Sequence, residues 1–155
     1  MRRRIKNKNS RKPDFKYNSL DIERFTNYVM QDGKKSIARK VVYSALDELA
    51  KETKADPLEV FDSAIKNTTP NMEVRSRRVG GANYQVPREV PEDRGTLLAM
   101  RWIIQVARAK KGQPIHKKLS QELILASKKE GDAIKKRENT HRMAESNKAF
   151  AHFSW

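Results

Sequence analysis

The segment RRVGGANYQVP, residues 77–87, decides how the rest of this chain is interpreted. Its Gly80-Gly81 pair supplies the positive φ angles that a two-residue hairpin turn requires. With this pair at the turn, residues equally distant from it in the sequence would face one another. Two strands of eight residues, at about 3.3 Å per residue, would extend roughly 25 Å from their base. The sequence therefore predicts one antiparallel β-hairpin arm over residues 72–90.

This hairpin is strongly basic, because Arg75, Arg77 and Arg78 follow one another along its first strand. A hairpin that lies on a core has one apolar and one polar face, whereas the faces here are mixed toward the tip. In one interpretation the arginines merely protect a solvated edge from aggregation. In the other, the hairpin is an arm placed against RNA, with the arginines on phosphates. Tyr84 would then stack on a base or pack over Arg77.

Outside the hairpin, apolar residues recur at three- and four-residue spacing, which is typical of amphipathic helices. Expected helix starts are marked by Ser19, Asp56 followed by Pro57, Pro91, Pro114 and Asp132. In the first three helices the expected buried residues are Leu20, Ile22, Phe25, Val29, Ile37, Val41, Val42, Ala45, Leu46, Leu49, Val60, Phe61, Ala64 and Ile65. In the last three they are Leu97, Leu98, Met100, Ile103, Ile104, Ala107, Ile115, Leu119, Leu123, Ala126, Ala133, Ile134, Met143 and Ala144. The sequence predicts a mainly α fold, a six-helix bundle whose last helix spans 133–149, with the hairpin between the third and fourth helices.

The charge of the chain limits its partners. Among 155 residues there are 34 Lys and Arg against 19 Asp and Glu, a net charge of +15. A charge this far from zero is usually offset by a polyanionic partner, which can be nucleic acid, an anionic membrane surface or an acidic protein. Residues 1–18 carry eight cations and one acid, so we expect a disordered, flexible basic arm on a single domain, 1–155.

Further cations gather between Arg94 and Gln121, where the chain has no acid at all. Solvated helix faces normally alternate in sign, so this run favours a phosphate-binding surface. Its members are Arg101, Arg108, Lys110, Lys111, Lys117 and Lys118. The Lys34-Lys35 pair, at the start of the second helix, is a further candidate anion site.

Several classes of function have no support in the sequence. No residues are arranged for general acid–base or nucleophilic catalysis, and the three histidines lack metal-ligand spacing. The segment DGKKS, residues 32–36, lacks the earlier glycine of a phosphate-binding loop. There is no cysteine and no apolar membrane span. We therefore expect no catalytic residue, metal, cofactor or membrane partner, and a cytoplasmic or organelle-interior location.

Four long segments resemble one known family: DGKKSIARKVVYSAL (32–46), NTTPNMEVRSRRVGGANYQVPREV (67–90), AMRWII (99–104) and KKRENTHRMAESNKAFAHF (135–153). They are similar to the bacterial-type small-subunit ribosomal protein seven. The resemblance implies a structural protein that binds the 3′ major domain of small-subunit ribosomal RNA and nucleates assembly of the head. It also implies a place at the exit tRNA site of the ribosome, with tRNA and neighbouring small-subunit proteins, notably protein eleven, as partners.

The same resemblance implies roles for particular residues. The implied ribosomal RNA contacts are Arg2, Arg3, Arg4, Lys6, Lys8, Arg11, Lys12, Lys34, Lys35, Arg75, Arg77 and Arg78. The residues implied to lie near exit-site tRNA are Gly80, Gly81, Ala82, Tyr84, Arg142 and Met143. Two alternatives of other classes remain. The first is an architectural DNA-binding protein with the hairpin in a minor groove, although such arms usually carry an apolar wedge at the tip. The second is a basic membrane-surface protein, which the several wide apolar stripes disfavour.

Overall fold

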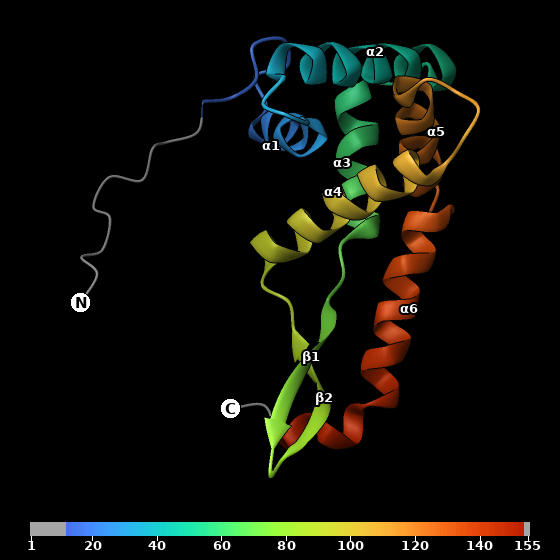
Figure 1. Ribbon diagram of the computed structural model, residues 1–155. Coiled ribbons are helices and arrows are strands. Elements are labelled where there is room, and N and C mark those ends of the chain that lie inside the picture. Colours follow the sequence, from blue (N-terminus) through green and yellow to red (C-terminus); the bar gives the residue numbers. More distant parts are fainter. Residues whose placement is uncertain (1–11, 154–155) are drawn as a thin grey trace, which may run out of the picture.

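The computed structural model describes residues 12–153, and residues 1–11 of the predicted 1–18 arm lie outside this range. The elements are α1 (Leu20–Val29), α2 (Lys35–Thr53), α3 (Pro57–Thr68), β1 (Met72–Val79), β2 (Ala82–Glu89), α4 (Glu92–Ala109), α5 (Ile115–Ser127), α6 (Asp132–Ser146) and a 3₁₀ helix, η1 (Lys148–Phe153). Helices α1 to α5 form the body, and the hairpin extends from one end of it with α6 alongside (Figure 1). The predicted architecture of six helices, with the hairpin between the third and fourth, is confirmed.

The helix starts show how local sequence sets these elements. The Asp56 carboxylate accepts a hydrogen bond from the Leu58 amide and caps α3 as expected, and the Ser19 hydroxyl accepts one from the Ile22 amide at the expected start of α1. Asp132 was predicted to cap α6, which is wrong, because Gly131 holds the cap position at φ 93° and Asp132 is the first helical residue. A Cβ on Gly131 would lie 3.0 Å from Glu122 Oε1. The positive φ and the close approach to α5 both favour glycine at this cap.

The sixth helix is also shorter than predicted. It ends at Ser146 rather than at residue 149, and the chain continues as the 3₁₀ helix η1. The Asn147 side-chain amide donates to the Met143 carbonyl at 2.8 Å, satisfying an acceptor that the last turn leaves open.

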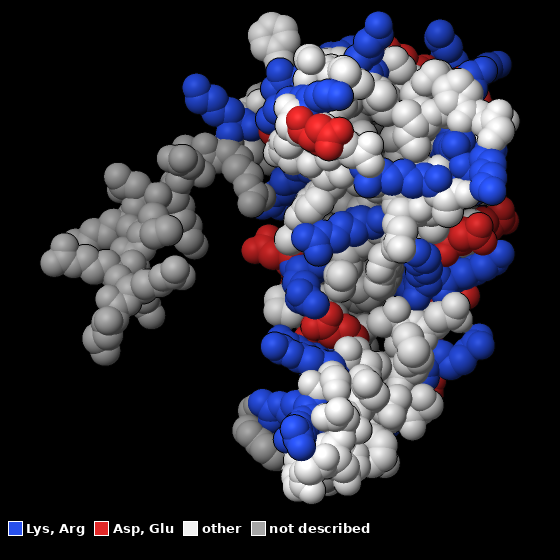
Figure 2. All heavy atoms as spheres, viewed as in Figure 1, with Lys and Arg blue, Asp and Glu red and all other residues white. Residues whose placement is uncertain are grey.

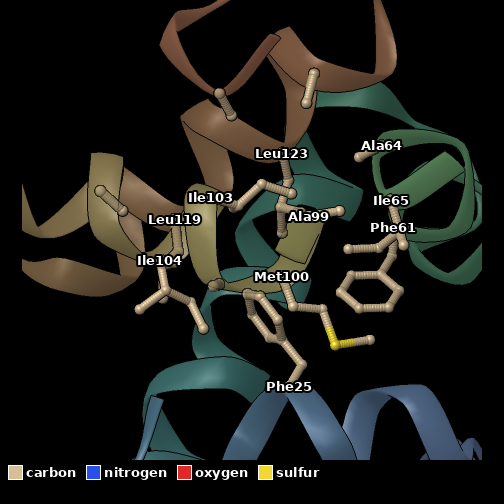
Figure 3. Close-up of a cluster of buried hydrophobic side chains, with 14 of the residues drawn as sticks. Phe25, Phe61, Ala64, Ile65, Ala99, Met100, Ile103, Ile104, Leu119 and Leu123 are labelled. Atoms are coloured by element: carbon tan, nitrogen blue, oxygen red, sulfur yellow. The ribbon is translucent and has the colours of Figure 1, made fainter. Parts of the chain in front are cut away.

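One hydrophobic core joins the five body helices and the start of α6. Phe25 from α1 and Phe61 from α3 meet edge to face, with ring centroids 5.3 Å apart, and Met100 from α4 lies beside them (Figure 3). Leu119 and Leu123 from α5 close the cluster on the other side. Because aromatic pairs and fully buried aliphatic side chains each contribute stability, this cluster fixes the body to which the hairpin is attached.

Three residues expected in the core are instead exposed: Leu20 by 48%, Ile37 by 59% and Met143 by 53%. In α2 the buried face is centred on Val42 and also uses Ala38, so the expected stripe is rotated and Ile37 falls outside it. The apolar stripe of α2 is broad, and periodicity alone does not select which edge of such a stripe is covered.

The hairpin has the register that its Gly-Gly turn predicts. Val79 pairs with Ala82 and the ladder continues to Met72 opposite Glu89, with Gly80 at φ 56° in the turn. The hairpin is nevertheless not a free-standing arm, because α6 packs against both strands and η1 packs against β2. This packing buries part of β2, including Val86 and Pro87.

The root of the hairpin is tied to the body by ionic and steric contacts. The carboxylate of Glu73 lies 2.8 Å from the guanidinium of Arg94 in α4 and 3.7 Å from that of Arg88 across the ladder. Gly95 permits α4 to approach the α3–β1 connection, since an added Cβ would lie 2.8 Å from Thr69 Cγ2. The hairpin is therefore held at a defined angle to α4.

The chain before α1 is also held on the body. Asp14 is buried, and its carboxylate accepts from the Tyr43 hydroxyl of α2 at 2.7 Å. Lys16 pairs with Asp47 at 2.7 Å. These contacts involve the last residues of the 1–18 segment, which its composition predicts to be flexible. The carboxylate of Asp14 anchors this end of the segment on the body.

Candidate nucleic-acid interface

The exposed cations of the hairpin form the first part of the candidate surface. Arg75 and Arg78 are exposed on β1, and within residues 12–153 neither has a hydrogen-bond or ion-pair partner. Arg77 is half-buried and pairs across the ladder with Tyr84. Two of the three predicted arginines therefore expose guanidinium groups that no acid of the described chain neutralises, as phosphate contacts require.

The two lysines at the start of α2 have different environments. Lys34 is exposed at the N-cap position of the helix. Lys35 forms an ion pair with Glu23, a carboxylate that is largely buried and that Arg39 also approaches at 3.6 Å. No acidic residue occupies the first turn of α2, so the positive end of its dipole is reinforced by Lys34. Of the predicted pair, Lys34 has the charge that is available to an outside anion.

The cations between Arg94 and Gln121 meet acids and carbonyls from other parts of the chain. Lys110 Nζ lies 2.6 Å from Oε2 of Glu122, which is fully buried, and Lys117 Nζ lies 3.8 Å from Glu48 of α2. The segment has no acid in sequence, but the fold brings three to it, because Arg94 at its start also pairs with Glu73. Lys111 is exposed and, in the described part of the chain, has neither an ion-pair partner nor a hydrogen-bond partner for its side chain.

The remaining members of this run contact neutral groups and keep their charge. The guanidinium of Arg108 donates to the Val29 carbonyl at 3.1 Å, and Lys118 donates to the Lys110 carbonyl at 2.5 Å. Arg101 lies over the ring of Tyr28, 5.1 Å from its centroid. These contacts orient the cations without neutralising them.

A groove of about 400 Å³ brings together cations that are far apart in the sequence. Lys34 from the start of α2, Arg108 from the end of α4 and Lys118 from α5 all line it, with one acid, Asp32. Its floor is aliphatic and includes the exposed Ile37. The acid-free run and the Lys34-Lys35 pair indicated these cations in separate parts of the sequence, and only the packing of α1, α2, α4 and α5 shows that they share one surface.

The tip of the hairpin has a different character. Tyr84 lies against Phe150 of η1, and the ring centroids are 5.3 Å apart. Arg142 and Met143 are exposed in α6, the helix that packs against both strands of the hairpin. Figure 2 shows mainly uncharged residues at the very end of this lobe, with a group of Lys and Arg side chains close beside them and more over the helices. Phe150 was not among the predicted site residues, and the aromatic spacing of KAFAHF is the signal that could have indicated it.

The histidine at the hairpin root is neutral at physiological pH. Burial, with a smaller contribution from the charge of Arg137, holds the pKa of His141 below its ordinary value. Its Nε2 accepts a hydrogen bond from the Asn71 amide at 3.1 Å, which a protonated ring could not do. His141 therefore joins α6 to the start of β1 and is not an additional cation of the surface.

Two further classes of site have no support in the described residues. No group of three or more His, Asp and Glu residues between 12 and 153 is placed to hold a metal ion. In the same range, no helix combines the length and apolarity needed to cross a membrane. The six N-terminal cations predicted to contact RNA, Arg2, Arg3, Arg4, Lys6, Lys8 and Arg11, lie outside the described residues, while Lys12 is exposed at their boundary.

A helical body, a basic two-stranded arm and unneutralised cations on both define a class of protein built to bind a polyanion. Residues 1–148 match the family described as Ribosomal protein S7p/S5e, and the chain belongs to this family. It is 55% identical over its full 155 residues to a protein of Thermotoga maritima named small ribosomal subunit protein uS7, and the match spans that whole protein. A protein of the same name from Petrotoga mobilis is also 55% identical over the full length of both chains. A third, from Dictyoglomus turgidum, is 55% identical over 143 residues, or 92% of each chain.

Proposed function

We propose that this protein is a non-catalytic structural component of the small ribosomal subunit that binds ribosomal RNA directly. The observation that carries the proposal is the pair of unneutralised arginines, Arg75 and Arg78, on a hairpin whose root is fixed to the body. A cation on a fixed backbone contributes more binding free energy when it contacts a phosphate than a cation on a mobile segment does, since less conformational entropy is lost on binding. Family membership and the names of the relatives support the same conclusion.

The finer role follows from where the surfaces lie. The RNA would be the 3′ major domain, contacted by Lys34, Lys111 and the hairpin arginines, and binding there would nucleate head assembly. The turn of the hairpin with Tyr84, and the exposed Met143 of α6, would lie at the exit site, near tRNA and a neighbouring protein such as protein eleven. Support for this division is the mainly uncharged surface at the very end of this lobe, which contrasts with the many Lys and Arg side chains over the helices (Figure 2).

The experiment measures binding to a small-subunit RNA fragment that contains the 3′ major domain, across a series of salt concentrations. Replacing Arg75 and Arg78 together by Ala should weaken binding and reduce the slope of log affinity against log salt, by about 0.7 to 0.9 for each phosphate that the variant no longer neutralises. Both side chains are exposed, so the fold should be unchanged.

The matched control removes two cations that are already paired with acids of their own helices. Arg24 lies 3.2 Å from Asp21, and Lys135 lies 3.0 Å from Asp132. The double Ala variant at these positions also removes two positive charges, but we expect a salt slope close to that of the wild type. An equal fall in both double variants would mean that net charge, and not the hairpin, governs binding.

Competition separates the ribosomal proposal from the DNA-binding alternative. Duplex DNA added at equal salt should displace the RNA fragment poorly, because the Gly80-Gly81 tip lacks the apolar wedge that minor-groove arms insert. Efficient displacement by duplex DNA would favour the architectural DNA-binding protein instead.

A further inference from the structure

Phe15 is the most exposed large apolar side chain in the described part of the protein, at 96%. A single exposed apolar residue is ordinary on a protein surface and by itself indicates nothing. Phe15 differs from other exposed apolar residues in two respects. The turn that holds it is rigid, and the chain around it is basic.

The turn is held from both sides of Phe15. The buried carboxylate of Asp14 accepts from the backbone amides of Lys16 at 3.0 Å and Tyr17 at 3.2 Å, and from the Tyr43 hydroxyl at 2.7 Å. The backbone of Asp14 adds two further bonds, one to the Asn18 amide and one to the carbonyl before α1. Residues on either side of the ring are therefore fixed, while the ring itself is left in solvent.

The surroundings of the turn are aromatic and cationic. The Lys16 ammonium lies 5.2 Å from the centroid of the Tyr17 ring and 5.5 Å from that of Tyr43, and the two rings meet edge to face. Before the turn, residues 1–12 contain seven Lys and Arg and no acid. Aromatic faces beside cations are the combination that proteins use to bind single-stranded nucleic acid.

We propose that Phe15 stacks on an unpaired nucleobase of the bound RNA, at the point where the basic N-terminal segment joins the body. This proposal rests on the proposed RNA-binding function and names one contact within it. Charge complementarity favours RNA over a protein pocket, because the chain on the N-terminal side of the ring is uniformly cationic. Lys12 is three residues before Phe15, so the Cα atoms of the two residues are at most roughly 11 Å apart. A phosphate bound by Lys12 and a base stacked on Phe15 can therefore belong to the same stretch of RNA.

The rigid turn gives the proposal its energetic reason. Stacking of a base on an aromatic side chain contributes sequence-tolerant affinity, provided that ordering the side chain does not consume the gain. Since Asp14 has already fixed the backbone, only the two side-chain torsions of Phe15 remain to be ordered when a base arrives.

The test compares variants of the full chain on the same 3′ major domain RNA fragment at fixed salt. Phe15→Ala should weaken binding by about 5- to 150-fold, the range expected when one stacked base is removed. Phe15→Tyr should bind as the wild type does, and Phe15→Leu, which is apolar but has no ring, should resemble Phe15→Ala. The salt slope should stay unchanged in all three, because the variants still neutralise the same phosphates.

The matched control is Leu20→Ala, which removes another exposed apolar side chain, 48% accessible, from the start of α1. It should leave affinity unchanged. Wild-type affinity in Phe15→Ala, or in Phe15→Leu, would overturn stacking while leaving the proposed function intact. Normal RNA affinity with poor incorporation of Phe15→Ala into small subunits would mean that the ring contacts a protein, which also overturns the proposal. A wild-type chain that fails to bind the fragment would overturn both proposals.

A spectroscopic measurement addresses the contact directly. In Phe15→Trp, stacking on a base should quench the added indole fluorescence when the RNA fragment binds, with the wild-type chain providing the baseline for Trp102 and Trp155. Binding without additional quenching would show that the side chain stays in solvent in the complex.

Discussion

Tyr84 in β2 and Phe150 in η1 are in ring contact, with centroids 5.3 Å apart and ring planes inclined by 54°. This contact joins the tip of the hairpin to the last described helix of the chain. Because α6 also packs against both strands, the hairpin and the C-terminal segment form one lobe that extends from the helical body (Figure 1). Any partner that binds the tip therefore meets both segments together.

The first prediction concerns this contact. Phe150→Ala should release the tip locally, at a cost of about 1 kcal/mol, since an aromatic pair contributes about 0.5 to 1.5 kcal/mol beyond its buried area. Amide hydrogen exchange should accelerate in residues 79–86, whereas protection in α4 and α5 should not change. Accelerated exchange throughout the body would show instead that η1 supports the whole fold. Ala149→Gly, which alters the same 3₁₀ helix at an exposed position, is the control.

A second prediction concerns the junction of α4, α5 and α6. The buried carboxylate of Glu122 lies 2.6 Å from Lys110 Nζ and accepts from the Ala133 amide at 3.0 Å. Lys110→Met would leave that carboxylate buried and unpaired, so the free energy of unfolding should fall by about 3 kcal/mol. Glu122→Gln should cost less, about 1 to 2 kcal/mol, because the amide can still accept from Ala133 and Lys110 can turn toward solvent.

Urea denaturation of the two single variants and the double variant measures this order. The double variant should be more stable than Lys110→Met alone, because it no longer buries an uncompensated charge. If Lys110→Met were the mildest of the three, the pair would not stabilise this junction.

The features that could be predicted from sequence are those that short segments set alone. The Gly80-Gly81 turn fixes the register of the hairpin, since a two-residue turn leaves one pairing for the residues around it. Asp56 and Pro57 fix the start of α3 in the same way. Each of these depends on residues within a few positions of one another.

The features that could not be predicted depend on which helices meet. The run from Arg94 to Gln121 lacks acids, but packing brings Glu48, Glu73 and Glu122 to it, and Lys110 becomes the ion-pair partner of a buried carboxylate. Exposure of Ile37 likewise reflects which edge of α2 its neighbours cover. Of the candidate site, sequence identified the cations, whereas the fold determines which of them stay unneutralised.

A third prediction tests how the hairpin is fixed at its root. Alanine usually stabilises a helix by about 1 kcal/mol relative to glycine, yet Gly95→Ala in α4 should destabilise this protein. The new Cβ would lie 2.8 Å from Thr69 Cγ2 and 3.3 Å from the Pro70 carbonyl oxygen. Overpacking of this kind typically costs about 1 to 3 kcal/mol.

A double-variant cycle identifies the clash. Thr69→Ser removes the Cγ2 methyl but keeps the hydroxyl that donates to the Ile65 carbonyl. Gly95→Ala should therefore be less destabilising in the Thr69→Ser background than in the wild type, as measured by urea denaturation. Equal costs in both backgrounds would assign the strain to the Pro70 carbonyl instead.

The last prediction concerns pH and the root of the hairpin. Burial holds the pKa of His141 below its ordinary value of 6.5, and its ring nitrogen accepts from the Asn71 amide. Well above pH 6.5 the ring is neutral in the folded and unfolded chains, so it adds no pH dependence there. As the pH falls below this value the unfolded chain takes up the proton first, and stability decreases until the folded pKa has also been passed. His141→Gln keeps a side-chain acceptor but cannot titrate, so between about pH 7.5 and 5 its free energy of unfolding should fall less than that of the wild type. The difference between the two curves isolates His141 from the carboxylates, and parallel curves would show that this histidine does not link protonation to folding.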